Sequence, residues 1–340
     1  MRSGKAIFVT SLYFLFYAMT VAIPKSLLAK EGGLTIIHTN DLHSYLFGFS
    51  LVDNLPLISD SEEGLGGWAR IASVINKERN NRDNSVLVLD AGDFLVGAFP
   101  YDIGIDKNSI PNLMKEMGYD AITLGNHDFD LGPGGLAEIL LSSYKRGSIP
   151  EIIFSSAIFS KERGEDDSLE ALFNKKIISP YIILEKYGFR IGIFGVMGRN
   201  AAMMSPFAYP VKFKDPIQVS IEMIKLLKIE KRMDMVICLS HSGLAKDALK
   251  SEDEILATKV EGIDIIISGH THTKLITPII ISDTIIVQAG EYGMHVGVLD
   301  VYYKDGMSQF RRYNLIEIND RIKKDERIQK KIESIVKNKS

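Results

Sequence analysis

The sequence predicts an α/β protein in which a mostly parallel sheet is accompanied by a second sheet. Short apolar runs typical of buried strands alternate with stretches whose apolar residues recur every three or four positions, which is the βαβ rhythm of a parallel sheet. Between residues 273 and 318, short β-rich runs follow one another, a pattern typical of an antiparallel meander that closes a second sheet. A chain of 340 residues, 46% of them hydrophobic, suffices for one large domain or two small ones, and we expect one.

Five apolar runs of strand length end in side chains that bind metals or move protons. The runs cover 34–37, 86–89, 121–124, 236–239 and 263–267, and the polar loops after them cover 38–43, 90–93, 125–130, 240–243 and 268–272. The carboxyl ends of parallel strands meet at one edge of a sheet, where α/β proteins bind their ligands. Strands needed only for packing would have no reason to end in this way. The sequence therefore predicts a functional site at this edge.

The same patterns predict the remaining elements in chain order. Helices are expected at 67–82, 110–117, 136–145, 215–231 and 244–260. Further strands are expected at 152–158, 181–187, 190–196, 277–281, 284–288, 296–303 and 310–318. Those at 181–187 and 190–196 are joined through Gly188 and predict a hairpin.

The first 29 residues differ from the rest of the chain. Arg2 and Lys5 precede an uncharged apolar run at 6–23, which is the layout of a secretory signal. We expect a cleaved signal peptide, with an N-terminal membrane anchor through residues 6–23 as the alternative. Either interpretation predicts an exported protein, periplasmic or extracellular. The expected division is then residues 1–29, a domain at 30–319 and a basic amphipathic helix at 320–340.

Charge and cysteine content exclude several classes of protein. A formal net charge of -3 gives no basic field for a nucleic-acid backbone, so polymeric nucleic acid is not expected as a partner. The single cysteine, Cys238, excludes disulfides within the chain and a thiolate zinc cluster. Of seven histidines, five lie past the first residue of the polar loops. His38, which directly continues the apolar run 34–37, and His295 lie in strand-like runs and are expected to be structural.

The loops offer oxygen and nitrogen ligands without sulfur. Asp41 and His43 alternate about Leu42, so in an extended strand both side chains leave one face, as two ligands of one ion must. Asp93 is a carboxylate able to bridge two ions. The other donors are Asn126, His241, His270 and His272. Such a set suits two divalent ions such as zinc, manganese or iron. Two ions about 3.5 to 4 Å apart clamp both oxygens of an in-line displacement and activate a shared water as hydroxide.

These motifs resemble the calcineurin-like metallophosphoesterases, and within them the amino-terminal catalytic domain of the secreted 5'-nucleotidase and sugar-nucleotide hydrolase family. The matching segments are 38–43, 66–70, 90–93, 117–120, 125–130, 239–241, 268–272 and 288–290. The resemblance implies a four-layer αββα sandwich with two mixed sheets. It also implies a phosphoric ester hydrolase acting on a small phosphorylated substrate, with nucleotides as one class.

Carried over residue by residue, the resemblance implies a ligand set and a catalytic pair. Asp41, His43, Asp93 and His272 would hold one ion, and Asp93, Asn126, His241 and His270 would hold the other. His127, oriented by Asp130, would contact the phosphoryl group and stabilise charge on its oxygens. Asp128, the remaining carboxylate of this loop, is expected to support a turn.

Two departures from the nucleotidase pattern leave the substrate open. The position of His272 is commonly glutamine in that branch. Those nucleotidases also carry a carboxy-terminal domain that binds the base, and the terminal helix of this chain occupies the place of the linker to it. A phosphomonoesterase similar to 5'-nucleotidases is therefore the leading hypothesis. A phosphodiesterase or sugar-nucleotide pyrophosphatase is the second, and a catalytically silent metal-binding scaffold is the third.

Overall fold

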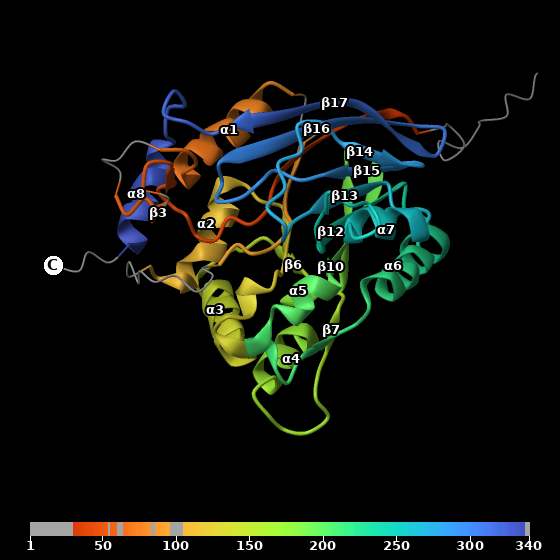
Figure 1. Ribbon diagram of the computed structural model, residues 1–340, viewed down its shortest axis with the longest axis horizontal. Helices are drawn as coiled ribbons and strands as arrows, with labels where there is room; N and C mark the ends of the chain where they lie inside the picture. The colour runs from red at the N-terminus through yellow and green to blue at the C-terminus, as the bar shows by residue number, and fades with distance from the viewer. Residues whose placement is uncertain (1–29, 54, 60–63, 83–85, 96–104, 337–340) are drawn as a thin grey trace, which may run out of the picture.

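The protein folds as two sheets packed face to face between layers of helices (Figure 1). The computed structural model describes residues 30–53, 55–59, 64–82, 86–95 and 105–336. The expected signal peptide or anchor at 1–29 lies outside these residues. Within the described part of the chain, no helix is both long enough and apolar enough to cross a membrane.

The first sheet has seven strands in the order β17-β16-β1-β4-β5-β6-β8. The strands are β1 (Gly32–Thr39), β4 (Val86–Asp90), β5 (Ala121–Thr123), β6 (Glu151–Ile153), β8 (Ile178–Ser179), β16 (His295–Lys304) and β17 (Met307–Glu317). From β1 to β8 neighbouring strands run parallel, whereas β16 and β17 add antiparallel pairs on the other side of β1. The sheet is therefore mixed, and its parallel part sends β1, β4 and β5 toward one edge.

The second sheet has six strands in the order β14-β15-β13-β12-β10-β9. They are β9 (Tyr181–Lys186), β10 (Phe189–Met197), β12 (Met235–His241), β13 (Ile265–Ser268), β14 (Ile279–Ile281) and β15 (Thr284–Val287). The hairpin predicted around Gly188 is confirmed, because β9 pairs antiparallel with β10. Two small pairs lie outside the large sheets: β2 (Phe49–Ser50) with β3 (Leu55–Pro56), and β7 (Ala157–Ile158) with β11 (Lys212–Phe213).

Alternation of side chains along the strands creates three apolar layers. In β1, Ile36 points into the core between the sheets, and Ile37 packs toward the outer helices. In β12, Ile237 faces the other sheet, and Val236 packs under the helices of the opposite side. This order of helix, sheet, sheet and helix confirms the expected αββα sandwich.

Helices cover both outer faces, as the colours of Figure 1 show. On the first sheet lie α1 (Trp68–Asn80), α2 (Ile110–Met117), α3 (Gly132–Arg146), α4 (Asp167–Asn174) and α8 (Glu326–Ile335). On the second lie α6 (Pro216–Ile224), the π-helical turn η5 (Lys225–Glu230) and α7 (Glu252–Lys259). Shorter turns are η2 (Lys107–Ser109), η3 (His127–Phe129), α5 (Arg199–Met203) and η4 (Pro206–Ala208). The terminal helix predicted at 320–340 is present over a shorter range, as α8, and residues 320–325 are not helical. Asp325 caps α8 by accepting from the backbone N–H groups of Arg327 and Ile328.

Three expectations about elements are wrong. The last four strands do not form one meander, because β14 and β15 join the second sheet whereas β16 and β17 extend the first. The run at 152–158 is two short strands, β6 and β7, in different sheets. Residues 244–251 are not helical, and α7 begins only at Glu252. In the first two cases the apolar runs are strands, but their pattern did not show which sheet they join. In the third, residues 245–250 are exposed, so their apolar side chains did not indicate a packed helix.

Candidate metal centre

The five predicted loops meet at the carboxyl edge of the two sheets. Backbone bonds join the first two, since Asp41 N–H donates to the carbonyl of Gly92 at 2.9 Å and His43 N–H donates to the carbonyl of Asp93 at 2.8 Å. The His270 N–H donates to the carboxylate of Asp41 at 3.0 Å, which brings the end of β13 in the second sheet onto the end of β1 in the first. The site is therefore built across the interface between the sheets.

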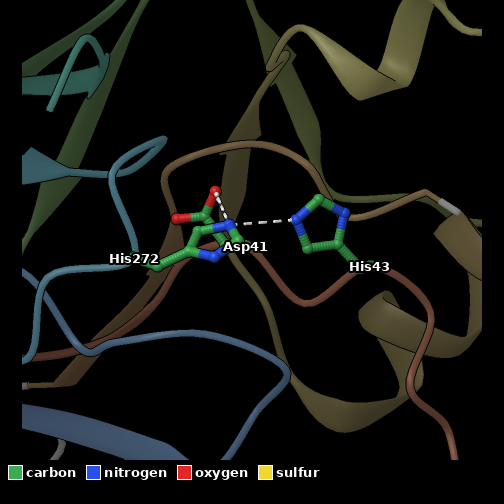
Figure 2. Close-up of side chains that lie close together, drawn as sticks. All are labelled: Asp41, His43 and His272. Carbon is green, nitrogen blue, oxygen red and sulfur yellow. Dashed lines mark hydrogen bonds and ion pairs between the residues drawn. The ribbon is translucent and has the colours of Figure 1, made fainter. Parts of the chain in front are cut away.

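One group of candidate ligands consists of Asp41, His43 and His272, whose ligand atoms lie within 4.8 Å of one another. Figure 2 shows His272 between the other two side chains, and its Nε2 lies 3.3 Å from Nε2 of His43 and 3.5 Å from Oδ1 of Asp41. Asp41 and His43 are buried, and the His272 side chain is 31% exposed. This group therefore reaches the surface on the His272 side.

A second group consists of Asp41, Asp93 and His241, all of them buried. His241 Nε2 lies 3.1 Å from Oδ2 of Asp93, and Oδ2 of Asp93 lies 3.9 Å from Nε2 of His43. Asp41 belongs to both groups, and Asp93 reaches from the second group to His43 of the first, so each of these carboxylates lies near ligands of both. Asn126 completes this side, with its Oδ1 3.1 Å from His241 Nε2 and 2.9 Å from His270 Nδ1. All seven predicted metal ligands are brought together.

The backbone at this site is held in an uncommon conformation. Asp41, His43, Asp93, His270 and His272 have positive φ values between 47° and 75°. Non-glycine residues rarely adopt this region, and each costs of order 1–3 kcal/mol, about the magnitude of one lost core contact. Such residues cluster where structure serves function, so the strain marks the ligand loops as more than connections.

The charges of the site fit divalent cations. Burial alone would raise the pKa of Asp41, but the hydrogen bond with His272 and the charge of His241 hold it below its usual value. Burial alone would lower the pKa of His241, but Asp93 raises it to about 10. Burial would likewise lower the pKa of His272, but Asp41 and Glu291 together raise it to about 10. Asp41 and Asp93 therefore favour positive charge beside them, on His241 and His272. A divalent cation satisfies the same demand for positive charge.

His127 and Asp130, the predicted catalytic pair, lie beside these groups. His127 Nδ1 lies 2.9 Å from Oδ2 of Asp130, and this hydrogen bond raises the pKa of His127. The His127 ring is 5.3 Å from the ring of His43, and its side chain is 35% exposed. Its backbone N–H donates to Asp93 Oδ1 at 2.8 Å. The imidazole is thus partly exposed beside His43, and Asp130 fixes its orientation.

Asp128 supports the loops rather than the centre itself. Its buried carboxylate accepts from three backbone N–H groups, those of Asp93 at 3.0 Å, Leu95 at 2.9 Å and Gly125 at 2.7 Å. These bonds join the loop after β4 to the loop after β5. The expected turn-supporting role is consistent with these contacts, and they position both Asp93 and Asn126.

The two histidines expected to be structural lie in β1 and β16. His38 is fully buried, accepts from the Tyr313 hydroxyl at 3.2 Å, and has its pKa lowered to about 3 by burial. His295 is also buried, and burial lowers its pKa to about 4. Neither belongs to the ligand groups described above.

Sequence reasoning missed two side chains that contact the ligand histidines. Glu291 pairs with Nδ1 of His272, and Asn200 Oδ1 lies 2.8 Å from Nε2 of His270. Asn200 is close to the end of β10, and Glu291 directly follows the matched segment 288–290. Polar residues just past strand ends were the signal that could have found them.

This four-layer sandwich, with paired carboxylate and imidazole groups at one edge, matches a known class of phosphoesterases. Residues 34–274 match the family model described as calcineurin-like phosphoesterase. A rat protein named 5'-nucleotidase is 31% identical over 337 residues, covering 92% of this chain and 54% of the rat protein. A Bacillus subtilis protein, named trifunctional nucleotide phosphoesterase protein YfkN, is 31% identical over 314 residues, covering 84% of this chain and 19% of that protein.

A solved structure supports the same assignment. The 5'-nucleotidase precursor from Thermus thermophilus superposes with a TM-score of 0.70 at 26% identity, covering 89% of this chain and 58% of that one. The chain belongs to the calcineurin-like phosphoesterase family. It spans 54% of the length of the rat relative and 19% of that of the Bacillus relative, so it corresponds to a part of each.

Proposed function

We propose that this domain hydrolyses phosphate monoesters at a centre of two divalent cations. The observation that supports this most directly is the convergence of two groups of buried ligands beside a partly exposed histidine that is paired with a carboxylate. Scaffold proteins have no need for such an imidazole at the mouth of a metal site. A silent metal-binding scaffold is therefore disfavoured.

The proposed division starts from the two groups but shares Asp93 and assigns Asp41 to one cation only. One cation would be held by Asp41, His43, Asp93 and His272, and the other by Asp93, Asn126, His241 and His270. Bound cations would supply Lewis acidity and an activated water for attack on phosphorus; zinc, manganese and iron suit this donor set equally.

The residues of the chain then act on the phosphoryl group. The Asp130 carboxylate accepts a hydrogen bond from Nδ1–H of His127, so Nε2 of the same ring is the atom free to face substrate. Because this contact raises the pKa of His127, the ring carries a proton on Nε2 over a wider pH range than a free histidine. That proton donates to a phosphoryl oxygen, where negative charge develops as the ester bond breaks.

Nucleotides are the proposed substrate class. The rat and Thermus relatives are named 5'-nucleotidases, and the Bacillus relative is named a nucleotide phosphoesterase. Because the chain spans only part of each relative, specificity for the base or sugar is not transferred with the centre. Phosphodiester or sugar-nucleotide hydrolysis is the second candidate, favoured by the broader name of the Bacillus protein.

A substrate panel tests the proposed activity. Phosphate release is measured with AMP, a cyclic nucleotide, a sugar nucleotide and an aryl phosphate, with manganese present and after removal of metal by a chelator. We expect release from AMP that disappears with chelation and returns when metal is added. Faster turnover of the cyclic or sugar nucleotide would select the second candidate. No metal-dependent turnover of any of the four would reject catalysis on these substrate classes.

We also propose the domain division and location predicted from the sequence. Residues 1–29 act as a signal peptide or membrane anchor, 30–319 form the phosphoesterase domain, and 320–340 form a basic carboxy-terminal segment whose helix is α8 (Glu326–Ile335). The positive-then-apolar order of the first 23 residues supports export. Cell fractionation, with mass determination of the mature amino terminus, distinguishes cleavage from anchoring, and a purely cytoplasmic location would contradict export.

A further inference from the structure

Glu291 lies in the loop between β15 and β16, and this loop is fastened to the end of β1. Asn40 donates through Nδ2 to the carbonyl of Gly290 at 2.6 Å and accepts through Oδ1 from the N–H of Ala289 at 2.8 Å. The N–H of Tyr292 donates to the carbonyl of Asp41 at 2.8 Å. The backbone on both sides of Glu291 is therefore held in register with the strand end that provides Asp41 and His43.

The Tyr292 side chain packs this loop against the same ligands. Its ring centroid lies 5.7 Å from that of His43 and 5.5 Å from that of His272, and it stacks on Tyr45 at 4.1 Å. Glu291 is thus carried on a segment with little freedom to move relative to the two imidazoles. Its side chain is only 29% exposed.

The two nitrogens of His272 face opposite partners. Nδ1 pairs with the carboxylate of Glu291, whereas Nε2 faces Asp41 and His43. A neutral imidazole carries one proton, and a cation can bind only the nitrogen without it. A carboxylate that accepts from Nδ1–H therefore selects the form of His272 whose Nε2 lone pair faces the ligand group.

Two of the other ligand imidazoles have neutral partners. His241 Nδ1 donates to the backbone carbonyl of Ala91 at 2.8 Å, and His270 Nε2 donates to the amide oxygen of Asn200 at 2.8 Å. His241 is fully buried, but His272 is partly exposed. An exposed ring has fewer packing contacts to fix its orientation, so its hydrogen-bond partner matters more.

We infer that Glu291 is a positioning residue that sets cation affinity at the Asp41, His43 and His272 group by orienting His272. This inference rests on the proposed two-cation centre. Glu291 acts through the imidazole and not on the phosphoryl group. A cation at Nε2 strengthens the Nδ1–H donor, so the carboxylate stabilises the cation-bound state.

Metal titration of the full chain tests this role. Wild type, Glu291→Ala and Glu291→Gln are stripped of metal and equilibrated with manganese against a graded chelator, and bound metal is counted. We expect Glu291→Ala to bind one equivalent about 10- to 100-fold more weakly, the usual effect of losing such a partner. The other equivalent should keep its affinity. Glu291→Gln keeps an acceptor oxygen, so it should recover part of the loss.

Two further variants make the comparison specific. Asn200→Ala removes the neutral partner of His270 and should weaken the other equivalent, by about tenfold at most, since one neutral hydrogen bond contributes about 0.5–1.5 kcal/mol. Glu185→Ala, in β9 with its side chain 73% exposed, should leave both affinities unchanged. Cobalt absorption spectra of Glu291→Ala report whether His272 still binds the metal. At saturating metal, the turnover of Glu291→Ala should approach that of wild type.

The outcomes separate the two proposals. A wild-type protein that binds two cations, together with a Glu291→Ala variant of equal affinity for both, overturns the inference and leaves the proposed function standing. A wild-type protein that binds no cation overturns both. If Glu291→Ala does not fold, the expected partial loss in Glu291→Gln supports the inference, and an unchanged Glu291→Gln overturns it.

Discussion

The two proposed cation positions differ in what holds their histidines. At one position His241 is fully buried and its Nδ1 donates to a backbone carbonyl, so strand β12 and the core fix the ring. At the other position His272 is 31% exposed and relies on the carboxylate of Glu291. The difference teaches that the His241 ring is fixed by the fold, whereas the His272 ring depends on a single side chain. Each position also holds one histidine of the other kind, namely buried His43 beside His272 and partly exposed His270 beside His241. We therefore expect the His241 position to retain its cation more firmly.

The largest effect should come from Asp93→Ala, because Asp93 belongs to both positions. Removing this carboxylate should empty at least one position. Turnover should then fall by on the order of a thousandfold or more, because losing a cation removes more transition-state stabilisation than losing one hydrogen-bond donor. Bound metal is counted by elemental analysis, and phosphate release gives turnover. Full occupancy of both positions in this variant would show that Asp93 does not bridge.

His127→Asn should separate catalysis from cation binding at both positions. The variant keeps a polar side chain but loses the proton donor on Nε2, so turnover should fall by on the order of a hundredfold or more. Metal content should equal that of wild type, because His127 is in neither ligand group. An unchanged rate would remove His127 from the mechanism.

The pH dependence of metal affinity probes both positions at once. Without a cation the pKa values of His241 and His272 are both raised to about 10, so each ring must release a proton before its Nε2 can bind. Affinity should therefore rise with pH, by about tenfold per pH unit for each proton released, and level off near the raised pKa. Titration calorimetry in buffers of different ionisation enthalpy counts the protons. If neither equivalent releases a proton, the two rings bind as neutral imidazoles and the positions are electrostatically alike.

The smallest effect on the comparison should come from Asp128→Ala, which loosens the support that both positions share. It leaves the N–H groups of Asp93, Leu95 and Gly125 unpaired, each at a cost of about 1–3 kcal/mol when buried. We expect a lower free energy of unfolding in denaturant, with similar weakening of both cations. Asp128→Asn keeps one acceptor oxygen and should lose less. Selective weakening of a single cation would show that Asp128 serves one position only.

Much of the fold could be predicted from the sequence because buried apolar residues recur at different spacings in helices and in strands. The helix at 110–117 and the hairpin about Gly188 match the structure closely, since apolar spacing and a glycine between two β-rich runs report local geometry. The partners of β16 could not be predicted in the same way. This strand has Val298 facing the helices and Leu299 facing the second sheet, so it reads as a buried strand whichever sheet it joins.

The candidate site was predictable for a different reason. Six predicted ligands lie two to four residues past a strand end, and His241 is the last residue of β12. The side chains of an α/β fold converge there, and the motifs resemble a known family. Glu291 and Asn200 were missed because they reach the histidines from other loops. Nothing in the local sequence indicates that Glu291 contacts His272. That contact depends on the hydrogen bonds by which Asn40, just after β1, holds Ala289 and Gly290.

The left-handed backbone at the ligand residues has a consequence for laboratory evolution of this protein. A glycine at His43 or His272 would relieve conformational cost at the same step that it deletes a ligand. Selection for thermal tolerance alone should therefore favour replacements at the ligand positions themselves. At these positions selection for stability would favour glycine, whereas selection for turnover would favour the ligand. Only a screen that measures both stability and turnover would retain the ligands.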